Sequence, residues 1–324
     1  MKTTDSVRII APARLHAGFL DLNGGLGRQF GGIGVGLQDI ATVISLRRGS
    51  GDGVSGTGDA RITETATALL RHFDIDAGVD ITLEQQIPAH QGLGSGTQTA
   101  LALGIAIGGL FGINTTVEEI ATATGRGKRS GIGIGVFKHG GFIVDSGRPE
   151  QQPLPTIVSH LAFPEQWRFV LVFDDSAEGI SGASERDAFA ALPPLDAGLA
   201  AETCRLVLMQ TLPGIIEQDC VCFGRSISRI QQICGGYFRP AQGGLFSSNA
   251  VAGAVETLLA NGATGGGQSS WGPTGFAVFP DQATAQQAMT AVTTQQADKQ
   301  TGITLLVTGA ENRNARMQIQ HTNN

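Results

Sequence analysis

The sequence predicts an α+β fold in two halves. Segments with strand character and segments with helical character are mixed along the chain without strict alternation, which favours α+β over a doubly wound parallel sheet. Residues 147–165 contain four prolines and interrupt this pattern near its middle, as a linker or crossover does. The length of 324 residues suits two domains of ordinary size, which we place at 1–165 and 166–324.

The first half combines strands and helices that local composition distinguishes. Residues 33–46 are rich in β-branched side chains and residues 79–87 alternate as a strand does, whereas residues 61–73 have helical character. A pair of threonines ahead of two glutamates predicts a capped start for a helix at 115–124. The expected strands are 7–11, 33–46, 79–87 and 140–145, and the expected helices are 61–73, 100–110 and 115–124.

The second half is predicted to open on a buried strand and to continue mainly with helices. Residues 168–173 (RFVLVF) predict that strand, and residues 202–234 are expected to be mostly helical. Further helices are expected at 246–259 and 284–297, and further strands at 276–279 and 303–307. The polar end, 312–324, is expected to be solvated, with its last residues frayed.

The composition is that of a folded protein without an extended anion-binding surface. Hydrophobic residues make up 41% of the chain and charged residues 15%, which excludes a disordered protein. The formal net charge of −6 argues against a surface for nucleic acid or anionic membranes. Any anion that this protein binds must therefore be captured by a local site.

Targeting signals and cysteine usage favour a cytoplasmic protein. The N-terminus lacks a charged region followed by an apolar one, so we expect no signal peptide. The longest apolar stretch, 100–112, is shorter than the ~20 residues of a membrane-spanning helix. None of the four cysteines forms a C-x-x-C pair, so packed, reduced thiols are expected rather than zinc ligands or disulfides.

A glycine-rich loop at 88–97 lies between a predicted strand and an apolar helix. Closely spaced glycines let the backbone turn tightly and aim several N–H groups at one point, while the helix N-terminus adds a partial positive charge. The pattern is not a Walker loop, because no Lys-Ser/Thr follows the last glycine. The loop predicts a phosphate-binding site; a tight turn with glycines for packing is the alternative. The candidate ligands are Gly92, Gly94, Ser95, Gly96 and Thr97.

Two glycine motifs resemble those of the GHMP kinase superfamily. Residues 88–95 resemble its P-x-x-x-G-L-G-S-S-A loop, and residues 263–267 resemble its third, C-terminal motif. The resemblance implies an N-terminal half like domain 2 of ribosomal protein S5, a ferredoxin-like C-terminal half, and a site in the cleft between them. Ser95 and Thr97 are then candidates for the hydroxyl that meets a magnesium ion.

The chain departs from the kinases of that superfamily at three places. Gly133 stands where their S-G-x-D segment carries an aspartate that helps to activate the acceptor hydroxyl. Loss of such a group removes a contribution of about 10²–10⁴-fold from phosphoryl transfer to an alcohol. The second serine of the loop is also replaced, by Gly96, and residues 267–273 extend the third motif in an unusual way.

At these three places the sequence resembles one branch of the superfamily, the β-ribofuranosylaminobenzene 5′-phosphate synthases of tetrahydromethanopterin biosynthesis. The similarity extends to residues 13–34, 125–133 and 140–145. It implies a transferase that condenses 5-phosphoribosyl 1-pyrophosphate with 4-aminobenzoate or 4-hydroxybenzoate and releases pyrophosphate and carbon dioxide. It also implies Mg²⁺ as cofactor and a homodimer. An ATP-dependent small-molecule kinase is the alternative, and a metabolite-binding protein without turnover is a third possibility.

The implied reaction needs cations and hydrogen-bond donors for three anionic groups rather than a strong base. Arg126, Lys128 and Arg129 concentrate positive charge in an otherwise acidic chain, and Ser130 follows them; a solvated basic turn is the alternative. Arg28, in a glycine-rich run, can hold a carboxylate or phosphate with two parallel hydrogen bonds.

Other polar residues near the motifs are candidates with open roles. Asp21 can orient Arg28, hold magnesium, or accept a hydrogen bond from the arylamine. Arg14 and His16 share a predicted strand, where a structural role is equally plausible. The residues expected to donate to phosphate or ribose after the third motif are Gly267, Gln268, Ser269 and Ser270. Trp271 can stack on an aromatic acceptor, although burial in a core is commoner for tryptophan.

Overall fold

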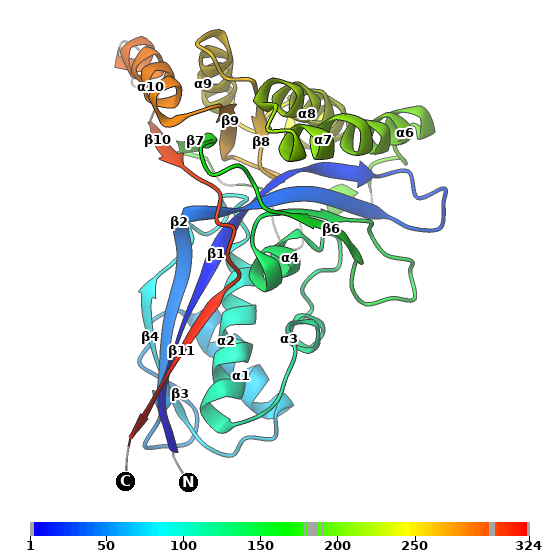
Figure 1. Ribbon diagram of the computed structural model, residues 1–324. Coiled ribbons are helices and arrows are strands. Elements are labelled where there is room, and N and C mark those ends of the chain that lie inside the picture. The colour runs from blue at the N-terminus through cyan, green and yellow to red at the C-terminus, as the bar shows by residue number, and fades with distance from the viewer. Residues whose placement is uncertain (1–2, 178, 180–186, 190, 298–301, 323–324) are drawn as a thin grey trace.

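The computed structural model describes residues 3–177, 179, 187–189, 191–297 and 302–322 (Figure 1). Its first half is a seven-stranded sheet built on two 19-residue strands, β1 (Thr3–Asp21) and β2 (Phe30–Arg48), which pair antiparallel. The other elements of this half are β3 (Val54–Ser55), α1 (Ala60–His72), β4 (Val79–Gln85), α2 (Ser95–Phe111), α3 (Val117–Ala123), α4 (Ile132–His139), β5 (Phe142–Asp145) and β6 (Ile157–Leu161).

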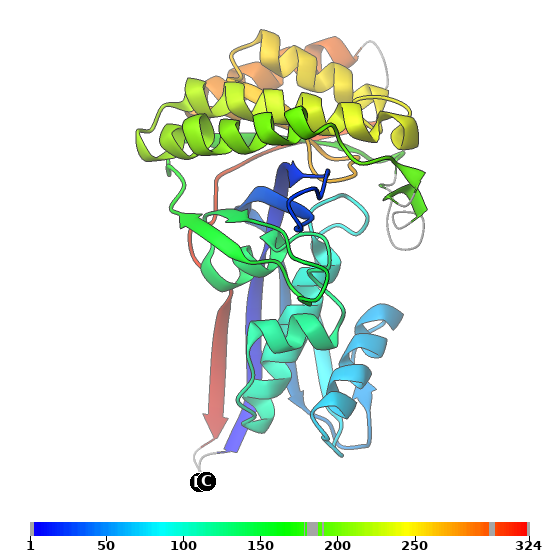
Figure 2. The same ribbon diagram turned by 90° about the vertical axis from the view of Figure 1, so that its right-hand side faces the viewer.

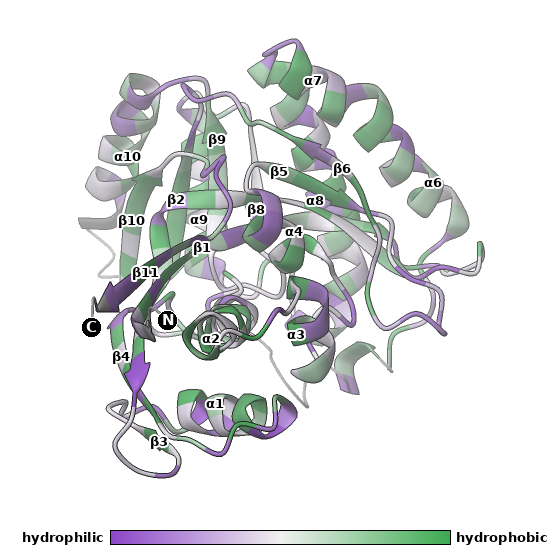
Figure 3. Cartoon of the chain, turned by 60° about the horizontal axis from the view of Figure 1, so that its bottom comes forward, coloured by the Kyte–Doolittle hydropathy of each residue, from purple (hydrophilic) through white to green (hydrophobic). Residues whose placement is uncertain are grey.

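Helix α2 is the centre of the first half. Its side chains are buried on nearly all sides, as its uniformly apolar sequence requires. Viewed from below, it lies between the sheet and the helices α1 and α3 (Figure 3). The predicted capping box of α3 is confirmed: Thr116 Oγ1 accepts from the Glu119 amide, and the Glu119 carboxylate accepts from the Thr116 amide.

The second half is a four-stranded antiparallel sheet with helices on it. Its strands are β7 (Arg168–Asp174), β8 (Gly265–Gln268), β9 (Gly275–Phe279) and β10 (Ile303–Thr308), in the order β10-β7-β9-β8. That order is 4-1-3-2 in terms of the chain, as in a ferredoxin-like fold. The helices are α6 (Ala197–Leu206), the π-helical η1 (Val207–Thr211), α7 (Leu212–Ile216), α8 (Cys220–Gln242), α9 (Asn249–Ala260) and α10 (Gln282–Ala297). Figure 2 shows α6 to α8 as a layer over the first half. The α+β prediction in two halves is confirmed.

Four of the described strands, β3, β6, β8 and β11, were not expected from the sequence. β11 (Arg316–Thr322) pairs antiparallel with β1, so the polar end predicted to be solvated is a strand, and the last strand of residues 166–324 lies in the first sheet. Its side chains are largely exposed and its stability comes from backbone pairing, which polarity alone does not reveal. β6 lies within the proline-rich stretch and pairs with β5 at the sheet edge.

The two halves share one continuous hydrophobic core. Phe19, Ile33 and Phe142 of the first half belong to the same buried cluster as Phe223 and Trp271 of the second. Because close-packed interiors resist displacement, this core fixes the position of each half against the other. Within the described residues, no helix is both long and apolar enough to cross a bilayer.

Candidate active site

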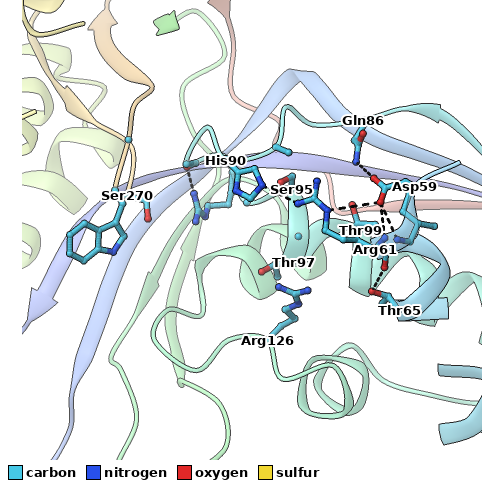
Figure 4. A pocket seen from close by; sticks show the side chains of 18 residues that line it. Asp59, Arg61, Thr65, Gln86, His90, Ser95, Thr97, Thr99, Arg126 and Ser270 are labelled. Carbon is cyan, nitrogen blue, oxygen red and sulfur yellow. Dashed lines mark hydrogen bonds and ion pairs between the residues drawn. The ribbon is translucent and has the colours of Figure 1, made fainter. Parts of the chain in front are cut away.

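A cavity of about 390 Å³ lies where the glycine loop meets the second half of the chain (Figure 4). Its wall comes from Arg14 of β1, the N-cap and start of α1, part of the segment 86–99, Arg126, and residues 270–272. The structure thus brings together eight of the predicted site residues from segments far apart in the sequence. They are Arg14, Gly92, Gly94, Ser95, Gly96, Thr97, Arg126 and Ser270.

The glycine loop has a conformation that only glycine adopts without strain. Gly92 and Gly94 have φ angles of 68° and 83°, in the left-handed region. A Cβ atom on Gly94 would lie 2.9 Å from Arg14 Cγ, and one on Gly92 would overlap the Ser269 carbonyl oxygen. Gly94 is also the N-cap of α2 and offers no side chain to the first amide groups of the helix. The Thr97 amide donates to the Gly94 carbonyl oxygen, whereas the amides of Ser95 and Gly96 precede the first intrahelical bond and can bind an anion.

Arg126 places a cation against this helix start. The Cβ position of Gly96 is 3.1 Å from Arg126 Nη1, and Figure 4 shows the Arg126 side chain extending toward Thr97. The guanidinium is half-buried, and its buried Nε atom has no hydrogen-bond partner among the described residues. Burial lowers the pKa of Arg126 from its usual value. A desolvated cation next to a helix N-terminus is an arrangement that an anion stabilises.

The third glycine motif fastens the loop to β1. Ser269 Oγ donates to the Gly92 carbonyl oxygen at 2.7 Å and accepts from the His16 amide at 3.1 Å. The Arg14 guanidinium donates to the same Gly92 oxygen. Ser269 is completely buried, so it positions the loop, whereas Ser270 reaches the cavity wall.

Sequence reasoning missed the polar residues at the other end of the cavity. Arg61 Nη1 lies 3.0 Å from His90 Nε2, and Arg61 Nε lies 4.0 Å from Asp59 Oδ1 (Figure 4). Asp59 is also the N-cap of α1, accepting from the Arg61 and Ile62 amides. The Asp-x-Arg sequence at a predicted helix start was the available signal, but it is typical of an ordinary cap.

Asp21 and Arg28 lie outside the cavity. Arg28 Nε donates to the Ser146 carbonyl at 3.0 Å and Nη2 donates to the Gly147 carbonyl at 2.9 Å, which ties the β1–β2 connection to the end of β5. Asp21 Oδ1 accepts from the amides of residues 23 and 24 and closes the same connection. Their predicted catalytic roles stay predictions.

Lys128, Arg129 and Ser130 also lie outside the cavity. The Lys128 carbonyl accepts from Arg148 and its side chain is exposed. The Arg129 guanidinium lies over the ring of Phe189, 4.9 Å from its centroid. Ser130 Oγ accepts from the Ile132 amide in the first turn of α4. The predicted basic cluster therefore separates: Arg126 faces the cavity, and its neighbours face elsewhere.

Three further candidates are buried beside the site. His16 is 2% exposed; burial, together with the Arg14 cation, lowers its pKa to about 3, so the imidazole is neutral. Gln268 Oε1 accepts from the Ser247 amide and hydroxyl, and Gly267 packs against Gln231 of α8. These two residues shape the second half rather than the cavity wall.

Gly133, which stands where the kinases carry an aspartate, is buried and is not among the described residues that line the cavity. The Gly133 carbonyl accepts from Gln98, and a Cβ on Gly133 would meet Thr97 Cγ2 at 3.1 Å. Asp59 is the only acidic residue among those that line the cavity in the described part of the chain. Asp145, which sequence reasoning missed, is fully buried and caps α4 through the Gly131 amide; burial raises its pKa to about 7.

Comparison with known proteins gives two domain matches and several named relatives. Residues 60–141 match the GHMP kinases N terminal domain, and residues 211–298 match the GHMP kinases C terminal domain. The chain is 31% identical over 296 residues to the beta-ribofuranosylphenol 5′-phosphate synthase of Methanothermobacter thermautotrophicus, covering 85% of this chain and 89% of that one. It is 35% identical over 241 residues to the protein of the same name from Archaeoglobus fulgidus, covering 70% and 76%.

Solved structures support the fold. A homoserine kinase from Cytophaga hutchinsonii superposes with a TM-score of 0.70 at 19% identity, covering 97% of this chain and 98% of that one. A mevalonate kinase superposes with a TM-score of 0.67 at 13% identity, covering 94% and 99%. At these identities the likeness concerns the fold alone.

Proposed function

The chain belongs to the family of the beta-ribofuranosylphenol 5′-phosphate synthases, within the GHMP superfamily, and we propose that it joins a phosphoribosyl group to a para-substituted benzoate at the cavity described above. It is an enzyme of the pentosyltransferase type. The donor in this proposal is 5-phosphoribosyl 1-pyrophosphate. The relatives' name contains a phenol, which supports 4-hydroxybenzoate as acceptor; 4-aminobenzoate is the other acceptor to be assayed.

The proposed reaction balances without an added base. The bond from the anomeric carbon to pyrophosphate breaks, and its electron pair leaves with pyrophosphate. The ring carbon that carries the carboxylate forms the new carbon–carbon bond, assisted by the para hydroxyl or amino group. The bond to the carboxylate then breaks, its electron pair restores the aromatic ring, and carbon dioxide leaves.

One observation carries the proposal: the half-buried Arg126 guanidinium lies beside the uncapped N-terminus of α2. This arrangement supports binding of the pyrophosphate group, whose negative charge grows as it departs. Donors fixed in advance at that position stabilise the departing charge without reorganising during the reaction. The glycine at 133 supports the synthase over a kinase, because the aspartate that helps the superfamily's kinases to activate an alcohol is absent at that position.

Magnesium fits this site as a partner of the substrate. No group of three or more His, Cys, Asp or Glu side chains suited to a metal occurs among the described residues. Mg²⁺ commonly binds through substrate phosphates and retained water, with few protein ligands. We propose that Ser95 and Thr97, both at the cavity wall, supply hydroxyl ligands. When bound, the ion neutralises charge on the pyrophosphate.

The test supplies 5-phosphoribosyl 1-pyrophosphate, Mg²⁺ and carboxyl-labelled 4-hydroxybenzoate or 4-aminobenzoate, and measures labelled carbon dioxide. Label released only when the donor is present is the expected result. Release with neither acceptor, or ATP-dependent phosphorylation of an alcohol substrate, would contradict the proposal. Omitting Mg²⁺ or adding a chelator is expected to stop release.

Two broader parts of the proposal have simple tests. We propose that the enzyme acts in tetrahydromethanopterin biosynthesis, which requires that its product be the C-riboside 5′-phosphate. Mass spectrometry of the reaction mixture identifies that product. We also propose a homodimer, which the family resemblance implies, and a cytoplasmic location, which the targeting signals and cysteine usage favour. Light scattering coupled to gel filtration measures its mass against the 33.6 kDa of one chain.

A further inference from the structure

The cavity has a second polar end, which the pyrophosphate proposed above does not use. The wall at this end comes from the start of α1 and the segment after β4, and its polar side chains are Asp59, Arg61, Thr65, Gln86 and His90. Arg61 Nη1 lies 3.0 Å from His90 Nε2, and the Arg61 side chain is 64% exposed, so a ligand in the cavity can reach the guanidinium. In Figure 4, Arg61 extends toward His90, whereas Arg126 extends toward Thr97. Two arginines thus approach the cavity from different elements.

The cavity wall carries an excess of positive charge, although the whole chain has a formal net charge of −6. Among the described residues that line it are three arginines and one carboxylate: Arg14, Arg61, Arg126 and Asp59. The Asp59 carboxylate also accepts from the Arg61 amide at 2.8 Å and from Gln86 Nε2 at 3.3 Å, while its ion pair with Arg61 Nε spans 4.0 Å. Asp59 therefore orients Arg61 without using up its hydrogen-bonding capacity. Such a wall indicates a ligand with more than one anionic group.

The Arg61 end of the cavity does not offer the surfaces that hold a nucleobase. Pockets for flat ring ligands are lined mainly by apolar and aromatic side chains. At this end the apolar lining residues of the described chain are Ile62 and Ala89. Trp271 belongs to the segment of Ser270, which Figure 4 shows on the other side of the cavity from Asp59, and it is 2% exposed. An arginine with polar neighbours suits a phosphate, which it can bind through two parallel hydrogen bonds.

The backbone holds the His90 ring beside Arg61. His90 has a φ angle of 60°, in the left-handed region, which residues other than glycine keep mainly at functional sites. Its carbonyl oxygen accepts from the Gly179 amide at 2.9 Å, which fixes the turn. Arg61 is fixed in the first turn of α1 by the Asp59 cap. The contact between the two side chains therefore connects α1 to the glycine loop, and both groups are in position before a ligand binds.

We propose that Arg61 and His90 form the subsite for the 5′-phosphate of the donor, at the opposite end of the ribose from the pyrophosphate at Arg126 and the start of α2. This inference rests on the proposed function for the identity of the sugar. The donor has two charged ends, a monoester at C5 and a pyrophosphate at C1, and the ribose between them lies along the cavity. The reacting anomeric carbon is at the pyrophosphate end. Arg61 therefore binds a group whose charge does not change during the reaction.

Two fragments of the donor test its two ends separately. Calorimetry measures the Kd of pyrophosphate with Mg²⁺, and then the Kd of ribose 5-phosphate in the presence of saturating pyrophosphate. Arg61→Gln is expected to raise the Kd of ribose 5-phosphate about tenfold and to leave that of pyrophosphate unchanged, and Arg126→Gln is expected to do the reverse. Arg71→Gln, in the last turn of the same helix as Arg61, is the matched control and should change neither Kd.

Steady-state kinetics of carbon dioxide release gives an independent readout. Because the 5′-phosphate contact is the same in the ground state and the transition state, Arg61→Gln should raise the KM for the donor about tenfold with little change in kcat. Arg126→Gln should lower kcat, because the departing pyrophosphate loses a cation. His90→Asn introduces a residue that tolerates a left-handed backbone, and it should raise the donor KM about threefold.

The outcomes distinguish this inference from the proposed function. An Arg61→Gln variant that loses affinity for both fragments equally, or for neither, overturns the subsite. Adenine that competes with ribose 5-phosphate for the wild-type protein places a base at this end and also overturns it. Labelled carbon dioxide released by Arg61→Gln with an unchanged donor KM overturns the subsite and leaves the proposed function intact. Selective loss of ribose 5-phosphate binding, when the wild-type protein releases no label, keeps the subsite and refutes the proposed function.

Discussion

Ser269 Oγ donates a hydrogen bond to the carbonyl oxygen of Gly92 across 2.7 Å, and this contact joins the segment after the third glycine motif to the glycine loop. The same hydroxyl accepts from the His16 amide, so one buried side chain connects β1, the glycine loop and the segment after β8. Gly92 and Ser269 are 177 residues apart in the sequence, and the hydrogen bond between them holds their two segments together at the cavity.

Ser269→Ala tests that connection. The change leaves the His16 amide without its acceptor in a buried place, a loss of about 1–3 kcal/mol in unfolding free energy. The loosened loop should also lower kcat/KM for the phosphoribosyl donor. Chemical denaturation and carbon dioxide release measure the two effects. Ser6→Ala, which removes an exposed Ser6–Gln320 hydrogen bond, is the control and should change neither.

Arg126→Gln tests the anion site. Because Arg126 Nε has no partner in the described structure, removing the charge should leave the melting temperature unchanged or raise it slightly. The affinity for pyrophosphate, measured by calorimetry, should fall at least about tenfold, as expected for loss of a charge-assisted contact. Arg71→Gln, at the exposed end of α1, is the control. Equal pyrophosphate affinity in the two variants would contradict the assignment.

Gly94→Ala tests the shape of the loop. A side chain at φ 83°, with its Cβ 2.9 Å from Arg14 Cγ, should cost about 1–3 kcal/mol and disturb the start of α2. Both the melting temperature and donor binding should decrease. Gly253→Ala is the matched control, since Gly253 lies in α9 with nothing within 4 Å of its Cβ position, and alanine there should stabilise the helix by about 0.5–1 kcal/mol. A tolerated Gly94→Ala would refute this account.

The pH dependence of stability tests the buried His16. Its pKa is about 3 in the folded protein, below the unfolded value near 6.5, so the unfolded chain takes up the proton first. The contribution of His16 to the free energy of unfolding is fully present above about pH 6.5 and is lost as the pH falls toward 3. Between pH 7 and 5 the loss should be about 2 kcal/mol.

A pair of histidine variants isolates this effect. His16→Gln should flatten the decrease in unfolding free energy between pH 7 and 5, measured by urea denaturation at each pH. His72→Gln replaces an exposed histidine in the last turn of α1 and should keep the wild-type slope. The same slope in both variants would show that His16 does not titrate as described.

The sequence by itself determined many of the elements, the fold family and the position of the glycine loop. The apolar run of α2, the β-branched run of β2 and the Thr116–Glu119 capping box are local patterns, because the neighbours that matter lie within a few residues. The glycines at 92 and 94 were likewise recognisable, since a tight turn before a helix requires them locally.

Only the tertiary structure decided which polar residues meet. Arg126 and Arg129 are three residues apart, yet one faces the cavity and the other lies over Phe189, because the turn before α4 sends them in different directions. Asp145 carried no sequence signal and Arg61 only that of an ordinary helix cap, since each gains its meaning from partners brought from distant segments. β11 was hidden for the same reason: backbone pairing with β1 is a long-range contact that a polar sequence does not display.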